Sequence, residues 1–275
     1  MARKKAGKIG KETGVMGKKR YCYAFEEGDG KNKKLLGGKG AGLCSMTQIG
    51  LPVPPGFVIT TEANVDYFDQ GSHFPEGLMD EVHEFMEALE NKTGKGFGDP
   101  AKPLLVSVRS GSALSMPGMM DTILNLGLND ETVKGLVKLT GDERFVNDAY
   151  RRFLQLFGKI GLGVADADFD AIFEEVKEKH HAAVDTELTA KALGEVVKRF
   201  KDLIKSATGR HFPQDPWAQL FLSVEGVFKS WMGKRAVDYR RQFNITPEMA
   251  HGTAVNICTM VFGNMGTDSD RKSVV

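Results

Sequence analysis

Two basic side chains stand where phosphate chemistry could take place. Lys39 lies in the glycine-rich segment LLGGKG, residues 35–40, and Arg109 follows the apolar run LLVSV, residues 104–108. Glycines around a lysine allow backbone N–H groups and a flexible cation to approach an anion closely. An arginine presents a permanently charged, fork-shaped guanidinium that suits pairs of phosphate oxygens. Together, the two patterns favour a phosphorylated ligand.

Each pattern also has a purely structural explanation. LLGGKG lacks the P-loop spacing, and an ordinary turn with a surface lysine is the commoner origin of such a segment. Arg109 could equally pair with a carboxylate. Met116, Met119 and Met120 fall in a compact loop, where their thioethers could line an adenine slot, although filling gaps in a core is the more common role of methionine.

The other reactive residue types show no catalytic or metal-binding pattern. The six histidines have no partner at the spacing of a metal site or a catalytic triad, so we assign none of them a catalytic role and no residue to a metal. Cys22, Cys44 and Cys258 are far apart, which predicts reduced, buried thiols rather than disulfides or zinc ligands. The acidic residues Glu174, Glu175 and Glu178 are expected on a solvated helix face.

Composition indicates a folded protein with an uneven charge distribution. The chain has 275 residues, of which 41% are hydrophobic, and no apolar run approaches the roughly 18 residues of a membrane span. Without a secretory signal, a cytoplasmic location is the default. Residues 1–20 hold eight Lys or Arg and one Glu, a net +7, which leaves −6 for the rest of a chain with a total of +1. We expect residues 1–19 to form a mobile basic leader, a solvated or added tail rather than an RNA-binding arm.

Hydrophobic periodicity and turn residues outline the elements that must position Lys39 and Arg109. A helical pattern runs almost without interruption from 130 to 209, and strands and shorter helices flank it. Asp215 and Pro216 mark the start of a late amphipathic helix. The predicted helices are 41–48, 62–68, 75–94, those within 130–209 and one within 215–245, and the predicted strands are 57–60, 103–108 and 252–262.

Four segments occur in one order that is typical of a known family. They are LLGGKGAGLCSMTQIGLPVPPGFVITTEA, PLLVSVRSGSALSMPGMMDTILNLGLND, FPQDPWAQLFLSVEGVFKSW and GTAVNICTMVFGNMG. From about Arg20 to Ser269 the chain closely resembles the N-terminal nucleotide-binding region of pyruvate, phosphate dikinase. The related phosphoenolpyruvate synthases share the glycine-lysine segment and the VRS core but lack MPGMMDTILNLGLN, which disfavours them.

The resemblance implies an α+β, ATP-grasp-like fold in which two lobes clamp a nucleotide. It implies that Lys39 and Arg109 hold the phosphates of ATP, that Thr122 contacts phosphate or nucleotide, and that Met260 and Val261 lie near the adenine. The expected parts are the leader 1–19, a first lobe of 20–128 plus 210–250, a helical insert at 129–209, and a remnant of the second lobe at 251–275.

The family reaction converts ATP, phosphate and pyruvate to AMP, pyrophosphate and phosphoenolpyruvate through a phosphohistidine. The implied ligands are ATP, phosphate and Mg²⁺, and the implied partners are the phosphohistidine and pyruvate-binding domains, with a homodimer allowed and neither membrane nor nucleic acid expected. The family's magnesium ligands, histidine domain and barrel do not match this sequence, so we expect a truncated phosphotransferase that lacks overall turnover alone. The alternatives are a phosphoenolpyruvate synthase-type fragment and a non-catalytic binding or regulatory protein.

Overall fold

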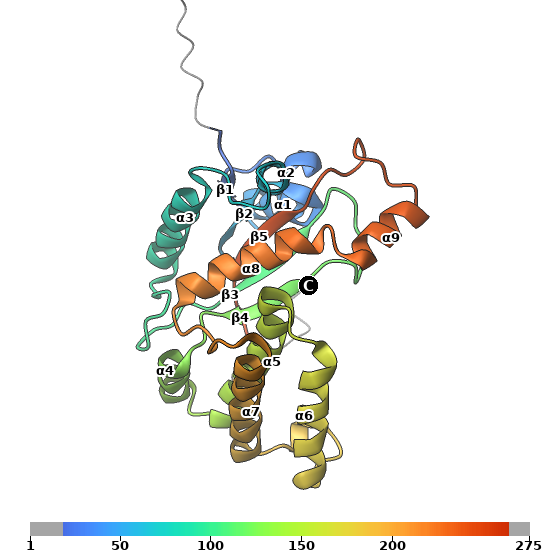
Figure 1. Cartoon of the computed structure of the whole chain (residues 1–275). Helices are drawn as coiled ribbons and strands as arrows, with labels where there is room; N and C mark the ends of the chain where they lie inside the picture. Colours follow the sequence, from blue (N-terminus) through green and yellow to red (C-terminus); the bar gives the residue numbers. More distant parts are fainter. Residues whose placement is uncertain (1–18, 264–275) are drawn as a thin grey trace, which may run out of the picture.

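The structure, a computed structural model, describes residues 19–263. Within them, one five-stranded sheet has helices on both faces (Figure 1). Except for Lys19, the expected leader lies outside the described residues, as does the chain after 263. The α+β class predicted from the sequence is confirmed.

The sheet has the order β1-β2-β5-β3-β4, and every neighbouring pair is antiparallel. Its strands are β1 Cys22–Ala24, β2 Gly56–Ile59, β3 Val106–Gly111, β4 Thr122–Leu126 and β5 Ala254–Thr259. The last strand along the chain therefore lies in the middle of the sheet. Its backbone pairs with β2 and β3, which belong to the expected first lobe, and the expected boundary after residue 250 stays a prediction.

Helices account for most of the remaining chain. They are α1 Lys33–Gln48, α2 Thr61–Asp69, α3 Leu78–Thr93, α4 Asp130–Thr140, α5 Glu143–Leu162, α6 Asp166–Lys179, α7 Ala190–Thr208, α8 Pro216–Ser230 and α9 Lys234–Gln242, with a 3₁₀ turn η1 at Asp185–Glu187. The single helix predicted within 215–245 is in fact two, because Trp231–Gly233 turns the chain between α8 and α9.

The two faces of the sheet pack against different helices. One face meets α1 in a small cluster that includes Leu36, Cys44 and Val58. The other face, with Val108 and Ile257 at its centre, belongs to a large cluster shared with α3, α5, α7 and α8. Figure 1 shows α8 lying across the sheet and α4 to α7 grouped below it. The helical region is thus joined to the sheet by one continuous hydrophobic core.

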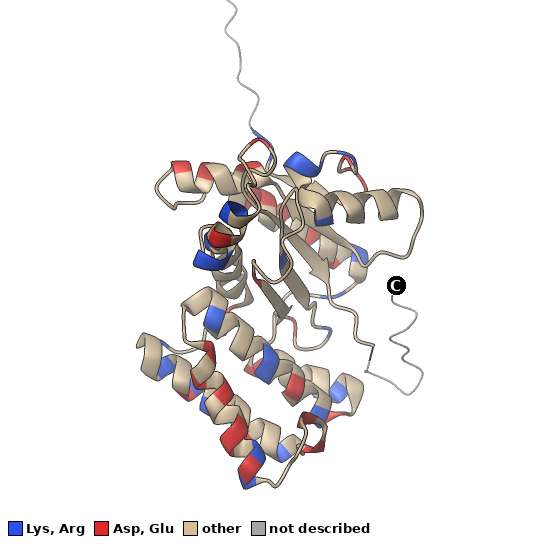
Figure 2. Ribbon diagram, turned by 90° about the vertical axis from the view of Figure 1, so that its right-hand side faces the viewer, with Lys and Arg blue, Asp and Glu red and all other residues tan. Residues whose placement is uncertain are grey.

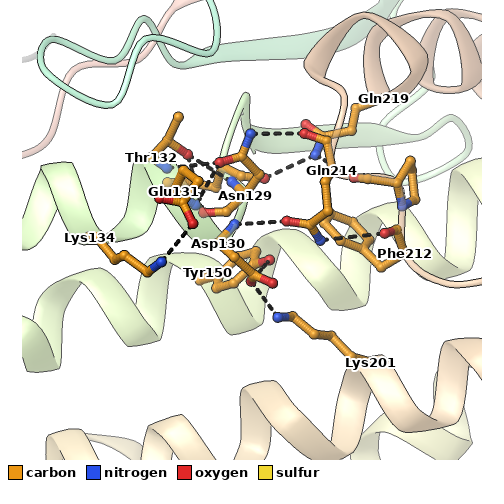
Figure 3. A network of polar contacts seen from close by, with 12 residues as sticks. Asn129, Asp130, Glu131, Thr132, Lys134, Tyr150, Lys201, Phe212, Gln214 and Gln219 are labelled. Atoms are coloured by element: carbon orange, nitrogen blue, oxygen red, sulfur yellow. Dashed lines mark hydrogen bonds and ion pairs between the residues drawn. The ribbon is translucent and has the colours of Figure 1, made fainter.

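A polar network fixes the helical region where it leaves β4 (Figure 3). Asn129 caps α4 by accepting from the backbone N–H groups of Glu131 and Thr132, and its amide donates to the carbonyl of Gln214 at 2.8 Å. Nearby, the hydroxyl of Tyr150 on α5 donates to Asp130 at 3.0 Å. These bonds tie the start of α4 to α5 and to the segment that precedes α8.

Charges on the helical region are mixed in sign. Figure 2 shows Lys or Arg interspersed with Asp or Glu along the lower helices. Glu174 pairs with Lys177 and Glu175 pairs with Arg199, each with a largely exposed carboxylate. The expectation of a solvated acidic face is borne out for these two residues.

Candidate functional site

Strand register aligns five residues across the α1 side of the sheet. Directly paired residues of neighbouring strands point to the same face. Across the sheet in the order β1-β2-β5-β3-β4, the paired residues are Tyr23, Val58, Asn256, Arg109 and Thr122. α1 contacts β2, β5 and β3. The side chain of Arg109 therefore emerges, exposed, beside the helix.

The sequence places Arg109 after a strand, whereas the structure places it inside β3. The strand extends to Gly111 because Arg109 and Gly111 continue the pairing with β5. Arg109 is exposed at this position, whereas its neighbour Asn256 in the row is fully buried. The buried amide of Asn256 donates to the carbonyl of Arg109 at 3.3 Å, which holds the backbone of β3 at this residue.

The glycine-rich segment is helical rather than a loop. α1 begins at Lys33 and breaks at Gly37, whose φ of 68° interrupts the helical backbone before the helix resumes. A Cβ on Gly37 would lie 2.2 Å from the carbonyl oxygen of Gly111. The N–H of Gly38 donates to the carbonyl of Ser112 at 2.8 Å. Glycine thus allows the first turn after the break to lie directly against the end of β3.

Lys39 projects from this turn toward the backbone of β3. Its Nζ donates to the carbonyl oxygen of Ser110 at 2.9 Å. Loss of solvent around the ammonium group lowers the pKa of Lys39 below its ordinary 10.5, and the positive charge of Arg109 lowers it further. The two cations are therefore close enough to repel one another, which favours an anion between them.

A cavity of about 560 Å³, here called the Lys39 cavity, opens beside this lysine. Its lining consists of Lys33, Gly38, Lys39, residues 110–118, Met120 and Thr122. These residues supply two ammonium groups, several hydroxyls and no carboxylate, a lining suited to a polyanion. Thr122 and Lys39, expected to share a ligand, thus share a cavity. Arg109 does not line it but lies opposite Thr122 in the strand pairing.

Ser112 is a candidate that the sequence reasoning did not identify. The residue is part of the lining of the Lys39 cavity and is only 5% exposed, and its buried Oγ has no hydrogen-bond partner among the described residues. A buried hydroxyl without a partner is costly unless a ligand or water satisfies it. The small residues after Arg109 were a signal, but nothing in the sequence distinguished this serine from Ser110 or Ser115.

Met260 and Val261 lie elsewhere. They line a separate cavity of about 230 Å³ with Lys95, Pro103, Leu105, Leu136 and Phe262. The structure does not bring them into the Lys39 cavity. Val261 is 59% exposed, while the backbone N–H of Met260 donates to Leu105 at 2.8 Å. Their expected position near an adenine stays a prediction.

The three methionines of the loop between β3 and β4 have different positions. Met116 is buried in a small cluster with Trp231 and Ala250, where it fills space. Met119 packs at the edge of this cluster. Met120 also contacts it. Met116 and Met120 both line the Lys39 cavity as well, whereas Met119 does not.

The described residues form no site for a metal ion held by protein side chains. No three His, Cys, Asp or Glu side chains group as ligands between residues 19 and 263.

Cys22 and Cys44 are free, buried thiols, as predicted, and Cys258 is half-buried. The ring of His83 stacks on Trp217 at 4.0 Å between centroids. Among the helices of the described part, none combines the length and apolar character that a membrane span requires.

Comparison with known proteins gives concordant matches. The family model described as "Pyruvate phosphate dikinase, AMP/ATP-binding domain" matches residues 33–72 and 69–269. The pyruvate, phosphate dikinase of Entamoeba histolytica is 60% identical over 247 residues, which cover 90% of this chain and 28% of the relative. The enzyme of Giardia intestinalis is 51% identical, with coverage of 86% and 26%, and that of Clostridium symbiosum is 47% identical, with coverage of 91% and 28%. The chain spans little more than a quarter of the length of these relatives.

Proposed function

The chain belongs to the pyruvate, phosphate dikinase family, and from this premise we propose that it binds ATP with the phosphate chain in the Lys39 cavity. The observation that carries the proposal is the cavity beside Lys39, whose lining offers two ammonium groups and several hydroxyls and no carboxylate. Arg109, which is opposite the cavity residue Thr122 in the strand pairing, supports it. Within the whole enzyme this site would serve the conversion of ATP, phosphate and pyruvate to AMP, pyrophosphate and phosphoenolpyruvate.

Each basic residue has a distinct role in the proposed site. The ammonium of Lys39 leaves the carbonyl of Ser110 and pairs with a phosphate oxygen, which satisfies its charge better than a neutral acceptor does. The guanidinium of Arg109 holds two phosphate oxygens at once. Both cations neutralise charge on the phosphoryl group as it is transferred, so the contribution of this chain is positioning and electrostatic stabilisation.

Hydroxyl and backbone groups complete the proposed phosphate contacts. Ser112 supplies a buried donor that has no partner among the described residues, and Thr122 supplies a second hydroxyl on the opposite strand. The first turn of α1 after Gly37 contributes the positive end of its dipole. We also propose that Met260 and Val261 lie beyond this site, along the path to the base.

Magnesium, which the family implies, does not fit a protein-held position in the described part. The lining of the Lys39 cavity offers no carboxylate, and Asp121 beside it is paired with Arg235. Mg²⁺ normally takes carboxylate or phosphate oxygens. We therefore assign none of the described residues as its ligand and derive no step from it.

Calorimetric titration with ATP, tripolyphosphate and adenosine tests the proposal. We expect ATP and tripolyphosphate to bind the 275-residue chain and adenosine to bind far more weakly, because the phosphate contacts dominate. Equal binding of adenosine and ATP would refute the assignment of the cavity to phosphate. We expect no AMP release that depends on pyruvate, since the phosphohistidine step is proposed to require domains beyond these residues, and robust turnover would contradict this.

A further inference from the structure

The loop of residues 112–121, which joins β3 to β4, is fastened to α9 by one side chain. Arg235, in the first turn of α9, donates through Nη2 to Oδ1 of Asp121 at 3.0 Å. Its Nη1 donates to the carbonyl oxygen of Gly118 at 3.3 Å. One guanidinium thus contacts two points of a loop that lies more than a hundred residues earlier in the chain.

A second, apolar contact fastens the same loop to the corner before α9. Met116 is 5% exposed and packs in a cluster with Trp231, which ends α8. Arg240 holds this tryptophan in place, with its guanidinium 3.8 Å from the centroid of the indole and Nη1 donating to the Trp231 carbonyl at 2.9 Å. Met116 therefore packs the middle of the loop against Trp231, and Arg235 binds the part of the loop that precedes β4.

The fastened loop forms much of the wall of the Lys39 cavity. Ser112 to Gly118 and Met120 line the cavity, while Asp121 immediately precedes Thr122. Movement of Gly118 or Asp121 would displace this wall, including Thr122. The contacts between α9 and the loop therefore bear directly on this wall of the cavity.

We propose that Arg235 is a positioning residue that holds the 112–121 loop in the conformation that binds phosphate. The binding part of this inference rests on the proposed function, whereas the fastening of the loop does not. Arg235 does not itself line the Lys39 cavity but contacts Gly118 and Asp121 of the loop, so it acts through the loop rather than on the ligand.

The chemistry of the guanidinium explains why arginine serves here. An isolated ion pair with a side chain as exposed as that of Arg235, at 57%, contributes little to global stability. A rigid fork that bridges a carboxylate and a carbonyl restricts two loop positions together, and a lysine cannot reproduce this geometry. The effect of removing it is therefore local, on loop order and ligand affinity.

Hydrogen exchange of the ligand-free protein tests the fastening directly. In Arg235→Gln, and in Asp121→Asn from the other side, amides of residues 113–121 should exchange about fivefold or more faster, with the melting temperature nearly unchanged. In Arg235→Lys, the same amides should exchange almost as fast as they do in Arg235→Gln. Arg241→Gln is the matched control on the same helix, because Arg241 is 79% exposed and, within residues 19–263, its guanidinium forms an ion pair with Asp238 alone.

Affinity for tripolyphosphate, measured by calorimetry on the same variants, tests the positioning role. We expect about a threefold to tenfold loss in Arg235→Gln and none in Arg241→Gln. Three results would overturn the proposal that Arg235 fastens the loop at both Gly118 and Asp121. They are unchanged exchange in Arg235→Gln, equally accelerated exchange in Arg241→Gln, and normal exchange in Arg235→Lys. Faster exchange with unchanged affinity would overturn the positioning role. If the wild type binds no tripolyphosphate, the proposed function fails, and the exchange data still decide whether Arg235 fastens the loop.

Discussion

The Nζ of Lys39 lies 2.9 Å from the carbonyl oxygen of Ser110, so the first turn of α1 after its break is bonded to the backbone next to Arg109. This bond joins residues 71 positions apart and holds the ammonium group of Lys39 against the backbone of β3. In the proposed site, a bound anion would compete with this neutral carbonyl for the lysine.

Replacing Arg109 by glutamine should weaken ATP binding about tenfold to a hundredfold, because a charge-assisted, two-pronged contact is lost. The exposed position of Arg109 on β3 should keep the melting temperature within a few degrees. Calorimetric titration gives the affinity. Arg241→Gln, which removes the same charge far from the cavity, should bind like the wild type, and an unaltered affinity in Arg109→Gln would exclude this side chain from the site.

ATP affinity should fall as pH rises through the pKa of Lys39, which burial and Arg109 place below 10.5. The neutral amine formed above that pKa no longer attracts phosphate. Since a guanidinium stays protonated, Lys39→Arg should show a flatter profile over about pH 8 to about pH 10. Titrations of both proteins across this range measure the difference, and parallel profiles would show that Lys39 carries no titrating contact.

Alanine at Gly37 should destabilise the protein by at least about 1–2 kcal/mol. The left-handed backbone disfavours a side chain, and its Cβ would meet the carbonyl of Gly111 at 2.2 Å. Gly42 is the matched control in the same helix, since a Cβ there has no neighbour within 4 Å. Gly42→Ala should stabilise by about 0.5–1 kcal/mol. Urea denaturation measures both values, and the same sign for both would contradict the close approach.

Removing the hydroxyl of Tyr150 should cost about 1–3 kcal/mol, because this residue is 2% exposed and bonded to Asp130. Burial and the nearby Asp130 raise the pKa of Tyr150 above its ordinary 10.0, so its contribution is present below that pH and is lost as pH rises through the raised pKa. Denaturation of wild type and Tyr150→Phe should therefore differ less at high pH.

Lys134→Gln provides the comparison for this network. Its pair with Glu131 is exposed on both sides and should contribute far less to stability than the buried bond of Tyr150. A loss of stability as large as that of Tyr150→Phe would show that burial does not determine the strength of these bonds.

Local patterns in the sequence identified several elements correctly. The helix expected over 62–68 is α2, and the side chain of Thr60 caps it by accepting from the N–H of Ala63. The helix expected over 75–94 contains α3, which buries a face formed by Leu78, Val82 and Met86. Caps and amphipathic faces depend on residues three or four apart, which a sequence displays directly.

Elements that depend on distant contacts were missed or misplaced. β1 has only three residues, and β4 follows the methionine-rich loop without a clear alternation, so neither was predicted. The start of α1 was placed at Ala41 because glycines disfavour helices. The structure tolerates them because Gly37 and Gly40 lie against β3, β5 and β2, which only the folded backbone reveals.

In the candidate site, too, residues were predicted from local patterns, and those that depend on contacts between distant segments were missed. Lys39, Arg109 and Thr122 were chosen from their chemistry and from the family pattern, and two of them share a cavity. Ser112 and Arg235 were not chosen, because their significance arises from burial and from contacts between segments far apart in sequence. Met260 and Val261 lie in another cavity, which sequence order alone could not exclude.

The central place of β5 has a consequence for how the chain can be shortened and how it folds. Without Ala254–Thr259, the pair β1-β2 and the pair β3-β4 have no backbone bonds to each other. During synthesis, the two pairs can join only after β5 has been made, roughly 200 residues after β2 and roughly 140 residues after β3. Such pairing between distant segments gives a high contact order. Recombinant versions that stop before residue 254 should yield unassembled halves, whereas those that extend beyond 259 retain the strand that unites them.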